Sequence, residues 1–247
     1  MENRPVISMA FPSIAPGVDD ETAKRYNRWV MEVYHPMSLK LDGVMGIDNW
    51  RIVGKNPEYP LLGAIYHYGN IAAYENSLKS PERQAIIEDL KTWGNRGVTE
   101  MVWNTAYGLV QSFRDETGSS IGKKQTTIEI APVMHLEAYR IRSEDQEKYN
   151  KWFQEYSRVF VPLFVKNCGL KGFDYFKCLN LPPRIPPREI ECPAYISILY
   201  FENLKAFEDF EESSEQVSFQ KALRNIFPLG LSYWWYVQYQ LNQSLRK

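Results

Sequence analysis

The sequence predicts an α+β protein built from two consecutive βαββαβ units. Three observations predict this class. Four short blocks of sequence recur in the same order in the two halves of the 247-residue chain, predicted strands and helices follow the same order around them, and a polar segment separates the halves. Ordered matches at a nearly constant offset indicate an internal repeat, because each repeat corresponds to one supersecondary unit.

The repeated blocks are short, and their order carries the evidence. Each block of the first half is given with its partner: Tyr26–Trp29 with Tyr149–Trp152, Gly43–Asp48 with Gly169–Asp174, Ile65–Asn76 with Ile198–Asp209, and Trp103–Ser112 with Trp235–Ser244. The offsets are 149 − 26 = 123, 169 − 43 = 126, 198 − 65 = 133 and 235 − 103 = 132. They drift only where loops differ in length, so we expect two copies of one unit.

Each half is expected to begin with a strand and then a helix with an acidic start, which the positive end of the helix dipole favours. A glycine-containing turn leads into the second strand. Asn70 and Asn203 are the expected N-caps between the third strand and the second helix, and apolar residues alternate in the last strand. The expected strands are Val6–Phe11, Gly46–Val53, Leu61–Tyr68, Glu100–Phe113, Val133–Ile141, Phe173–Leu179, Tyr195–Phe201 and Ser232–Leu245; the expected helices are Asp20–Leu39, Ile71–Trp93, Glu144–Val165 and Leu204–Ile226. This order is the split βαβ, or ferredoxin-like, motif.

A polar segment sets the expected domain boundaries. Residues 114–126 are polar and contain glycine and serine. We therefore expect a first ferredoxin-like unit at residues 1–113, a linker at 114–126 and a second unit at 127–247. The proline-rich segment Leu181–Arg188 predicts a stiff surface loop, because proline cannot donate a hydrogen bond to a sheet.

Composition and charge argue against several classes of function. The net charge is −1 and the basic residues are spread along the chain, so we expect no nucleic-acid binding, which needs a basic patch. No apolar run approaches the roughly 20 residues of a membrane helix, and we expect no membrane association. Three cysteines without a metal-ligand pattern predict reduced thiols in a cytoplasmic protein and no metal site. Whether the chain forms a homo-oligomer stays open.

The bare face of each four-stranded sheet needs a cover, and two units can bury their open faces against each other. In this respect the chain resembles the dimeric α+β barrel superfamily, which implies an intrachain α+β barrel. The first helix carries an aromatic stripe with Tyr26 and Trp29, followed by Tyr34-His35-Pro36. This pattern is similar to the EthD-like branch, whose first helix has an aromatic pair and a His-x-Pro sequence. Tyr34 here occupies the histidine position of that branch.

The resemblance implies a small-molecule enzyme. We expect cofactor-free acid–base chemistry, as a lyase, isomerase, cyclase or monooxygenase, on an apolar or aromatic substrate. A haem enzyme similar to chlorite dismutases is one alternative, with one of the three histidines as the axial ligand that haem needs. A non-catalytic ligand-binding or assembly protein is another. Sequence signatures of nucleotide binding, serine hydrolases and zinc proteases are absent.

The candidate catalytic residues are His35, His67, His135 and Asp48. Imidazole titrates near neutral pH, which suits proton transfer. On an ideal helix His35 points away from the apolar stripe, which favours a solvated histidine unless a kink at the following proline re-aims it. His67 ends a strand, where it either lines a cavity or is a satisfied, partly buried histidine.

His135 shares a strand face with Glu137, so the two form either an acid–base pair or a plain polar contact. Asp48 matches Asp174, and each is either a desolvated base or a structural turn or cap residue. The candidate substrate-binding residues are Tyr34, Trp50, Tyr66, Trp103, Asn104 and Tyr107, for which core packing is the alternative. Because His35 and His67 have no histidine counterparts in the second half, we expect catalysis in one half and a scaffold role for the other.

Overall fold

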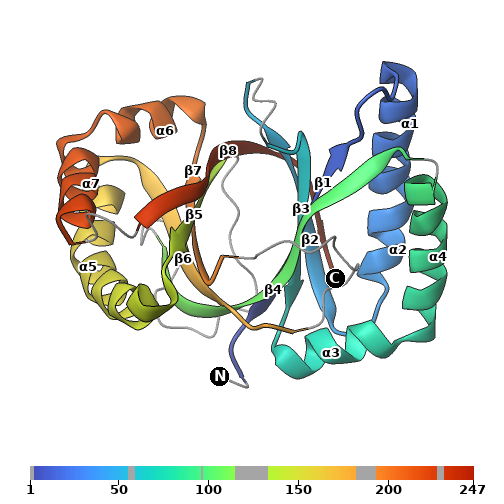
Figure 1. The fold of residues 1–247 in the computed structure, drawn as a ribbon, viewed down its shortest axis with the longest axis horizontal. Helices are drawn as coiled ribbons and strands as arrows, with labels where there is room; N and C mark the ends of the chain where they lie inside the picture. The colour runs from blue at the N-terminus through green and yellow to red at the C-terminus, as the bar shows by residue number, and fades with distance from the viewer. Residues whose placement is uncertain (1–2, 55–58, 96, 115–132, 182–192, 227–230) are drawn as a thin grey trace. The chain divides into compact units, whose positions relative to one another are not determined.

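The structure is a computed structural model that describes residues 3–54, 59–95, 97–114, 133–181, 193–226 and 231–247. The elements of the first half are β1 Val6–Ile14, α1 Asp20–Trp29, the π-helical turn η1 Val30–Tyr34, α2 His35–Leu39, β2 Val44–Ile52, β3 Leu62–Tyr68, α3 Ile71–Lys79, α4 Pro81–Asn95 and β4 Thr99–Arg114. Those of the second half are β5 Val133–Ile141, the 3-10 turn η2 Ser143–Asp145, α5 Gln146–Asn167, β6 Leu170–Cys178, β7 Tyr195–Phe201, α6 Leu204–Glu211, α7 Ser214–Ile226 and β8 Leu231–Arg246. The predicted strands all form, and their order is the predicted one (Figure 1).

The strands of the described residues pair in the order β1-β3-β2-β8-β5-β7-β6-β4, and this order closes on itself. Within the first half β3 lies between β1 and β2, and within the second half β7 lies between β5 and β6, with every pair antiparallel. The predicted fold class, an α+β barrel of ferredoxin-like units, is therefore confirmed.

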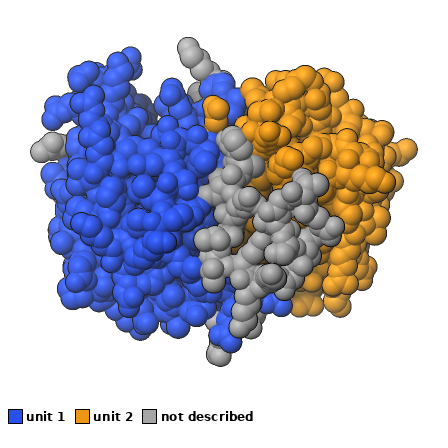
Figure 2. Space-filling model, turned by 180° about the vertical axis from the view of Figure 1, so that it is seen from behind, with its two compact units in different colours: residues 1–108, 178–192, 241–247 blue, residues 109–177, 193–240 orange. Residues whose placement is uncertain are grey.

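The chain divides into two compact units, shown in different colours in Figure 2. Unit 1 contains residues 1–108, 178–192 and 241–247, and unit 2 contains residues 109–177 and 193–240. The long strands β4 and β8 each begin in one unit and end in the other. Residues 115–126 of the predicted linker and 182–188 of the predicted proline-rich loop lie outside the described residues.

Three of the predicted helices are interrupted. The helix expected at residues 71–93 breaks at Ser80, because Pro81 starts a new helix and cannot continue the hydrogen-bond ladder. The helix expected at residues 204–226 breaks between Glu211 and Ser214, where the Ser213 hydroxyl accepts a 3.2 Å hydrogen bond from the backbone N–H of Gln216. The first helix changes to π-helical geometry over Val30–Tyr34.

The predicted N-caps are confirmed. The side-chain oxygen of Asn70 accepts a hydrogen bond of 2.9 Å from the backbone N–H of Ala73, and that of Asn203 accepts one of 3.0 Å from Ala206. An N-cap of this kind satisfies a donor that the first helical turn leaves unpaired, and it contributes about 1 kcal/mol. The same cap therefore fixes the start of the second helix in both halves.

Unit 1 has a core between its sheet and its helices. In Figure 1, α1, α2 and α4 lie along one face of β1, β2 and β3. Buried side chains of the helices, such as Tyr26 and Val30, pack on strand residues of that face, such as Ile47 and Tyr68. The core of unit 1 therefore lies between the helices and the helix-facing side of this sheet.

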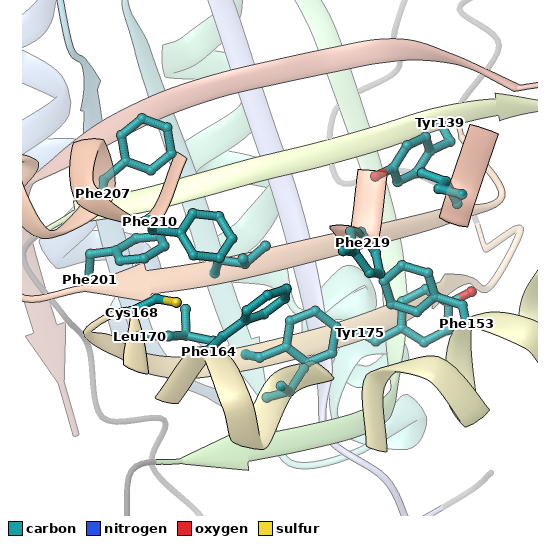
Figure 3. Close-up of a cluster of buried hydrophobic side chains, with 14 of the residues drawn as sticks. Tyr139, Phe153, Phe164, Cys168, Leu170, Tyr175, Phe201, Phe207, Phe210 and Phe219 are labelled. Atoms are coloured by element: carbon teal, nitrogen blue, oxygen red, sulfur yellow. The ribbon is translucent and has the colours of Figure 1, made fainter. Parts of the chain in front are cut away.

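Unit 2 has a core dominated by aromatic side chains. Phe164 of α5 and Phe201 of β7 both lie against Phe210 of α6, with ring centroids 5.0 and 5.1 Å away (Figure 3). Phe153 stacks on Tyr175 at 4.4 Å. Each such pair adds about 0.5–1.5 kcal/mol beyond the burial of its area. Phenyl and phenol rings therefore make up most of the core between the helices and the sheet of unit 2.

An ion pair between an arginine and a buried aspartate holds the end of each long strand. Arg114 at the end of β4 donates to Asp174 of β6 over 2.7 Å, and Arg246 at the end of β8 donates to Asp48 of β2 over 2.7 Å. Both aspartates are buried in the middle of strands. The expectation that Asp48 and Asp174 act as turn or cap residues is therefore wrong, because each carboxylate is the counter-charge of an arginine.

Two glycines make room for these arginines. A Cβ at Gly46 would lie 2.8 Å from Cδ of Arg246, and a Cβ at Gly172 would lie 3.1 Å from Cδ of Arg114. The glycines that recur in the second sequence block thus have a steric reason. They let the arginine stem cross the strand that carries its aspartate.

We expect the Asp174→Asn variant to lose about 3–5 kcal/mol of its free energy of unfolding, because the Arg114 side chain is 5% exposed and would be left without its counter-charge. The Asp48→Asn variant should lose less, because Arg246 is 27% exposed and water can solvate it. Urea denaturation followed by tryptophan fluorescence measures both losses. Equal losses would contradict this ranking.

The acid stability of the fold should depend on Asp48. Burial acts to raise the pKa of Asp48, but the hydrogen bonds and charges of His67 and Arg246 outweigh it and hold the pKa below its ordinary value of 3.8. A depressed folded-state pKa stabilises the fold above the unfolded-state pKa, and this contribution is lost as the pH falls through the folded-state value. Between about pH 6 and about pH 3 the wild type should therefore lose more stability than Asp48→Asn, measured by urea denaturation at each pH.

Candidate active site

A small cavity lies in unit 1 between the helix-covered face of the sheet and the helical segment α1–η1–α2. Its volume is about 40 Å³, room for roughly three water molecules. Its lining mixes aromatic, small apolar and polar side chains. Those that decide its chemistry are Tyr34, His35, Asn49, Ala10, Ala64 and Tyr66.

The floor of this cavity belongs to a row of residues on four adjacent strands, of which the members on β2, β3 and β1 line the cavity. Asn49 of β2 stands opposite Ala64 of β3, Ala64 stands opposite Ala10 of β1, and Ala10 stands opposite Asn104 of β4. Residues directly opposite one another in antiparallel strands share a face of the sheet. Two methyl groups therefore lie between two buried amides, and the small side chains leave the space that the cavity occupies.

The matching row of unit 2 is filled. It contains Tyr175, Ser197, Glu137 and Tyr236 on β6, β7, β5 and β8. The nearby cavity of unit 2, lined by Glu137 and aromatic residues such as Phe153, has a volume of about 10 Å³, which suffices for a single water molecule. In this cross-strand row the side chains of unit 1 are therefore smaller than those at the matching positions of unit 2.

The π-helical turn forms the roof and directs His35 inward. His35 follows Tyr26 by nine residues. In a regular α-helix, at about 100° per residue, this separation would place the two side chains on opposite faces of the helix. The π turn inserts the equivalent of one residue, since the backbone N–H of His35 donates to the carbonyl of Val30, five residues earlier. His35 is accordingly 1% exposed, and the expectation of a solvated histidine is wrong.

The imidazole of His35 lies among aromatic rings. Its centroid is 5.9 Å from the ring of Tyr66, which it meets edge-on at 84°, and 5.7 Å from the ring of Tyr34. Burial, assisted by Tyr34, raises the pKa of Tyr26 in the same wall, so Tyr26 keeps its proton. His35 is thus the cavity-lining group whose ordinary pKa lies closest to neutral.

His67 lies on the opposite face of the same sheet. Its Nε2 is 2.5 Å from Oδ2 of Asp48, the carboxylate that also binds Arg246. Trp50, Trp103 and Tyr107 are buried on this face as well. Trp103 stands opposite Phe11, and Tyr107 stands opposite Ile7. Trp50 stands opposite Gly63, on which the ring of Phe11 packs. The structure therefore gathers Tyr34, His35 and Tyr66 at the cavity. It places Asn104 in the same cross-strand row as the floor, opposite Ala10, but not among the lining residues. His67, Asp48, Trp50, Trp103 and Tyr107 lie apart from the cavity.

His135 belongs to a buried polar network in unit 2. Its Nε2 lies 3.3 Å from Glu137, and its Nδ1 lies 3.1 Å from the amide of Gln238. The same carboxylate accepts hydrogen bonds from Tyr139 at 3.1 Å and from Ser197 at 3.0 Å. Both ring nitrogens of His135 therefore have protein partners, as a structural polar network requires.

Sequence reasoning did not single out Asn49. Asn49 is 2% exposed, lines the cavity and accepts a 3.0 Å hydrogen bond from Asn242 of β8. Its counterpart 126 positions later is Tyr175. The exchange of a small amide for a large aromatic residue directly after the matched aspartates was the available signal.

The three histidines do not fit haem. A cofactor pocket occupies about 300–1,000 Å³, whereas His35 faces a cavity of about 40 Å³. His67 is held by Asp48, and His135 is enclosed between Phe207 and Tyr236, with ring centroids 5.0 and 4.4 Å away. Among the described residues, no group of three or more His, Cys, Asp or Glu side chains is arranged to hold a metal ion.

Solved structures with this fold include proteins that are described as different kinds of enzyme. An anthrone oxidase-like protein matches over 99% of this chain and 94% of its own, with 12% identity and a TM-score of 0.65. A proposed monooxygenase from Fusobacterium nucleatum matches over 100% and 96%, with 9% identity and a TM-score of 0.60. A variant of the chlorite dismutase from Candidatus Nitrospira defluvii matches over 98% and 93%, with 11% identity and a TM-score of 0.55. At these identities the similarity establishes the fold.

No protein-family model and no curated protein matches the sequence. Within the part of the chain that the structure describes, none of the helices has the length and apolar character needed to cross a membrane.

Proposed function

We propose that this chain is a cofactor-free enzyme that binds a small apolar or aromatic substrate in the cavity of unit 1 and removes a proton from it. The observation that carries the proposal is the buried imidazole of His35 in the wall of a cavity whose floor is hollowed by Ala10 and Ala64. The names of the proteins with this fold, a proposed monooxygenase and an anthrone oxidase-like protein, support a catalytic role.

His35 would act as a general base. In its neutral form the imidazole accepts a proton from an acidic C–H or O–H group of the substrate, a transfer that typically contributes 10²–10⁴-fold to the rate. The negative charge then remains on the substrate, where the amide of Asn49 can stabilise an oxygen atom. Return of the proton to another atom gives an isomerase. Capture of the carbanion by dioxygen and protonation give a hydroperoxide, and loss of water from it, where the carbon carries a second hydrogen, leaves a carbonyl group that retains one oxygen atom, as in a monooxygenase. Proton removal is the step common to both.

The size of the cavity limits the substrate. A volume of about 40 Å³ admits a single aromatic ring only if side chains at its margin move. Leu62 and Leu90 are half-buried lining residues that such a movement would displace, and side-chain shifts of this kind are common on binding. We therefore propose a substrate with one ring or fewer.

We also propose that the two halves arose by tandem duplication and that the chain belongs to the EthD-like branch. Support for duplication comes from contacts that recur at matched positions. Asp48 and Asp174, 126 positions apart, each bind an arginine, and these arginines, Arg114 and Arg246, are 132 positions apart. The branch is supported by the Tyr34-His35-Pro36 sequence at the roof of the cavity.

Haem binding is the weaker alternative. The cavity beside His35 is small, and both other histidines are engaged by neighbouring side chains. Appearance of a Soret band on addition of haemin, with loss of that band in a histidine variant, would favour this alternative.

We expect His35→Val, which introduces the residue found at the matching position Val161, to lower proton transfer by about 10²–10⁴-fold. The physical reason is loss of the base that lines the cavity. The measurement is solvent deuterium uptake at carbon by a panel of single-ring enolisable ketones in the absence of dioxygen, followed by NMR. It reports removal of the proton next to the carbonyl group and its return from solvent.

His135→Gln serves as the control, because this histidine lies in the network of unit 2 and should leave exchange unchanged. Catalysed exchange that persists in His35→Val would refute the assignment of His35. Binding of the panel without any catalysed exchange would indicate a non-catalytic ligand-binding protein instead.

A further inference from the structure

The last residues of β8 reach the candidate active site from the end of the chain. Asn242 donates a 3.0 Å hydrogen bond to the side-chain oxygen of Asn49, and Gln243 donates one of 3.4 Å to the backbone carbonyl of Met31. Asn49 belongs to the floor of the cavity, and Met31 belongs to the π turn that forms its roof. The consecutive residues Asn242 and Gln243 therefore bind the floor and the roof of the cavity, respectively.

The orientation of the Asn49 amide follows from its neighbours. The Nδ2 of Asn242 lies between the oxygen of Asn49 and the sulfur of Met31, 3.8 Å away. A thioether sulfur can only accept a hydrogen bond, so the Asn242 atom facing it is the NH2 group. Asn49 must then present its oxygen to Asn242, which leaves its own NH2 group free of that bond and available to the cavity that Asn49 lines. The cavity thereby gains a buried hydrogen-bond donor.

Gln243 supports the unusual helix geometry. In a π turn the carbonyl of Met31 would accept from residue 36, but Pro36 has no N–H group. The side chain of Gln243 donates to that carbonyl instead. Proline alone does not impose the π turn, because Pro162 lies inside the continuous helix α5.

Unit 2 provides a matched comparison 132 positions earlier on β4. Gln111 corresponds to Gln243, and its side-chain oxygen accepts a 2.9 Å hydrogen bond from Ser157, the counterpart of Met31. Val110 corresponds to Asn242, and it has no amide with which to orient a neighbour. The glutamine bond to the helix is thus common to both units, whereas the Asn242–Asn49 pair is specific to unit 1.

We propose that Asn242 and Gln243 are positioning residues of the active site, and that the oriented Asn49 amide selects substrates with an acceptor oxygen, a phenolate or an enolate. The inference rests on the proposed function of the same cavity. Asn49 would donate to the oxygen on which charge develops when His35 removes the proton. Asn242 fixes the donor, and Gln243 holds the turn that carries Tyr34 and His35.

The test uses two matched probes, 4-nitrophenol and 4-nitroaniline, which differ in presenting an acceptor oxygen or a donor NH2 group. Binding to the full chain is measured by absorbance titration, which for 4-nitrophenol also gives the pKa of the bound ligand. The wild type should bind 4-nitrophenolate and lower the pKa of the bound phenol. Failure of the wild type to bind 4-nitrophenol at millimolar concentration would overturn the inference.

Asn242→Asp should reverse the preference. A carboxylate at position 242 accepts from the NH2 group of Asn49, so Asn49 turns its oxygen to the cavity. We expect phenolate binding to weaken on the order of 10- to 100-fold, as for loss of a hydrogen bond to a charged group, and 4-nitroaniline binding to strengthen. The new charge alone cannot strengthen binding of the neutral aniline, and position 242 is exposed to solvent. Unchanged preference for phenolate in this variant would refute the orienting role.

Gln243→Leu and Gln111→Leu form the second comparison. Each removes a glutamine bond to the first helix of a unit, so both should lower stability by similar amounts. Only Gln243→Leu should weaken 4-nitrophenolate binding and slow His35-dependent deuterium exchange. Equal effects of the two variants on binding would refute the role of Gln243.

The outcomes also separate this inference from the proposed function. If His35→Val leaves exchange intact while Asn242→Asp reverses the probe preference, the catalytic proposal fails and the oxygen-binding inference stands. If exchange requires His35 while Asn242→Asp binds both probes as the wild type does, the inference fails and the proposed function stands.

Discussion

The pairing of a strand-terminal arginine with a buried aspartate is the interaction on which much of this structure depends. Arg246 binds Asp48 in unit 1, and Arg114 binds Asp174 in unit 2. Each arginine ends a long strand that starts in the other unit. Loss of Asp174 would leave the buried Arg114 without its counter-charge in a low-dielectric environment, which costs more than the pair itself contributes, whereas water can solvate the partly exposed Arg246.

The ion pair at Asp48 also fixes the end of β8 for the candidate active site. Arg246 lies three and four residues after Gln243 and Asn242, the side chains that bond to the π turn and to Asn49. A strand end held at this point cannot fray, so its side chains keep their register on β2. The energetic anchor and the two positioning residues therefore belong to one short segment, although they have different tasks.

The two units use the same framework for different interiors. In unit 1 alanines occupy the middle of the cross-strand row, and His35 faces the space above them. In unit 2 Ser197 and Glu137 occupy the middle positions, and Glu137 completes its hydrogen bonds with its own strand and its neighbours. A fully satisfied polar network rigidifies a core, whereas small apolar side chains leave room for a ligand. This contrast agrees with a catalytic unit and a supporting unit.

The order of strands and helices was determined by the sequence itself. The repeated blocks, the caps at Asn70 and Asn203 and the alternation in the last strands are local signals, and the structure follows them. Tertiary structure decided the direction of His35, because a π turn rotates the face of a helix, and a proline at this position does not by itself impose such a turn, as Pro162 inside the continuous helix α5 shows. It also decided the floor of the cavity, since Asn49, Ala64 and Ala10 are neighbours only through strand register. Local propensity acts over a few residues, whereas a cavity is made by strands whose contacts are set by pairing across the sheet.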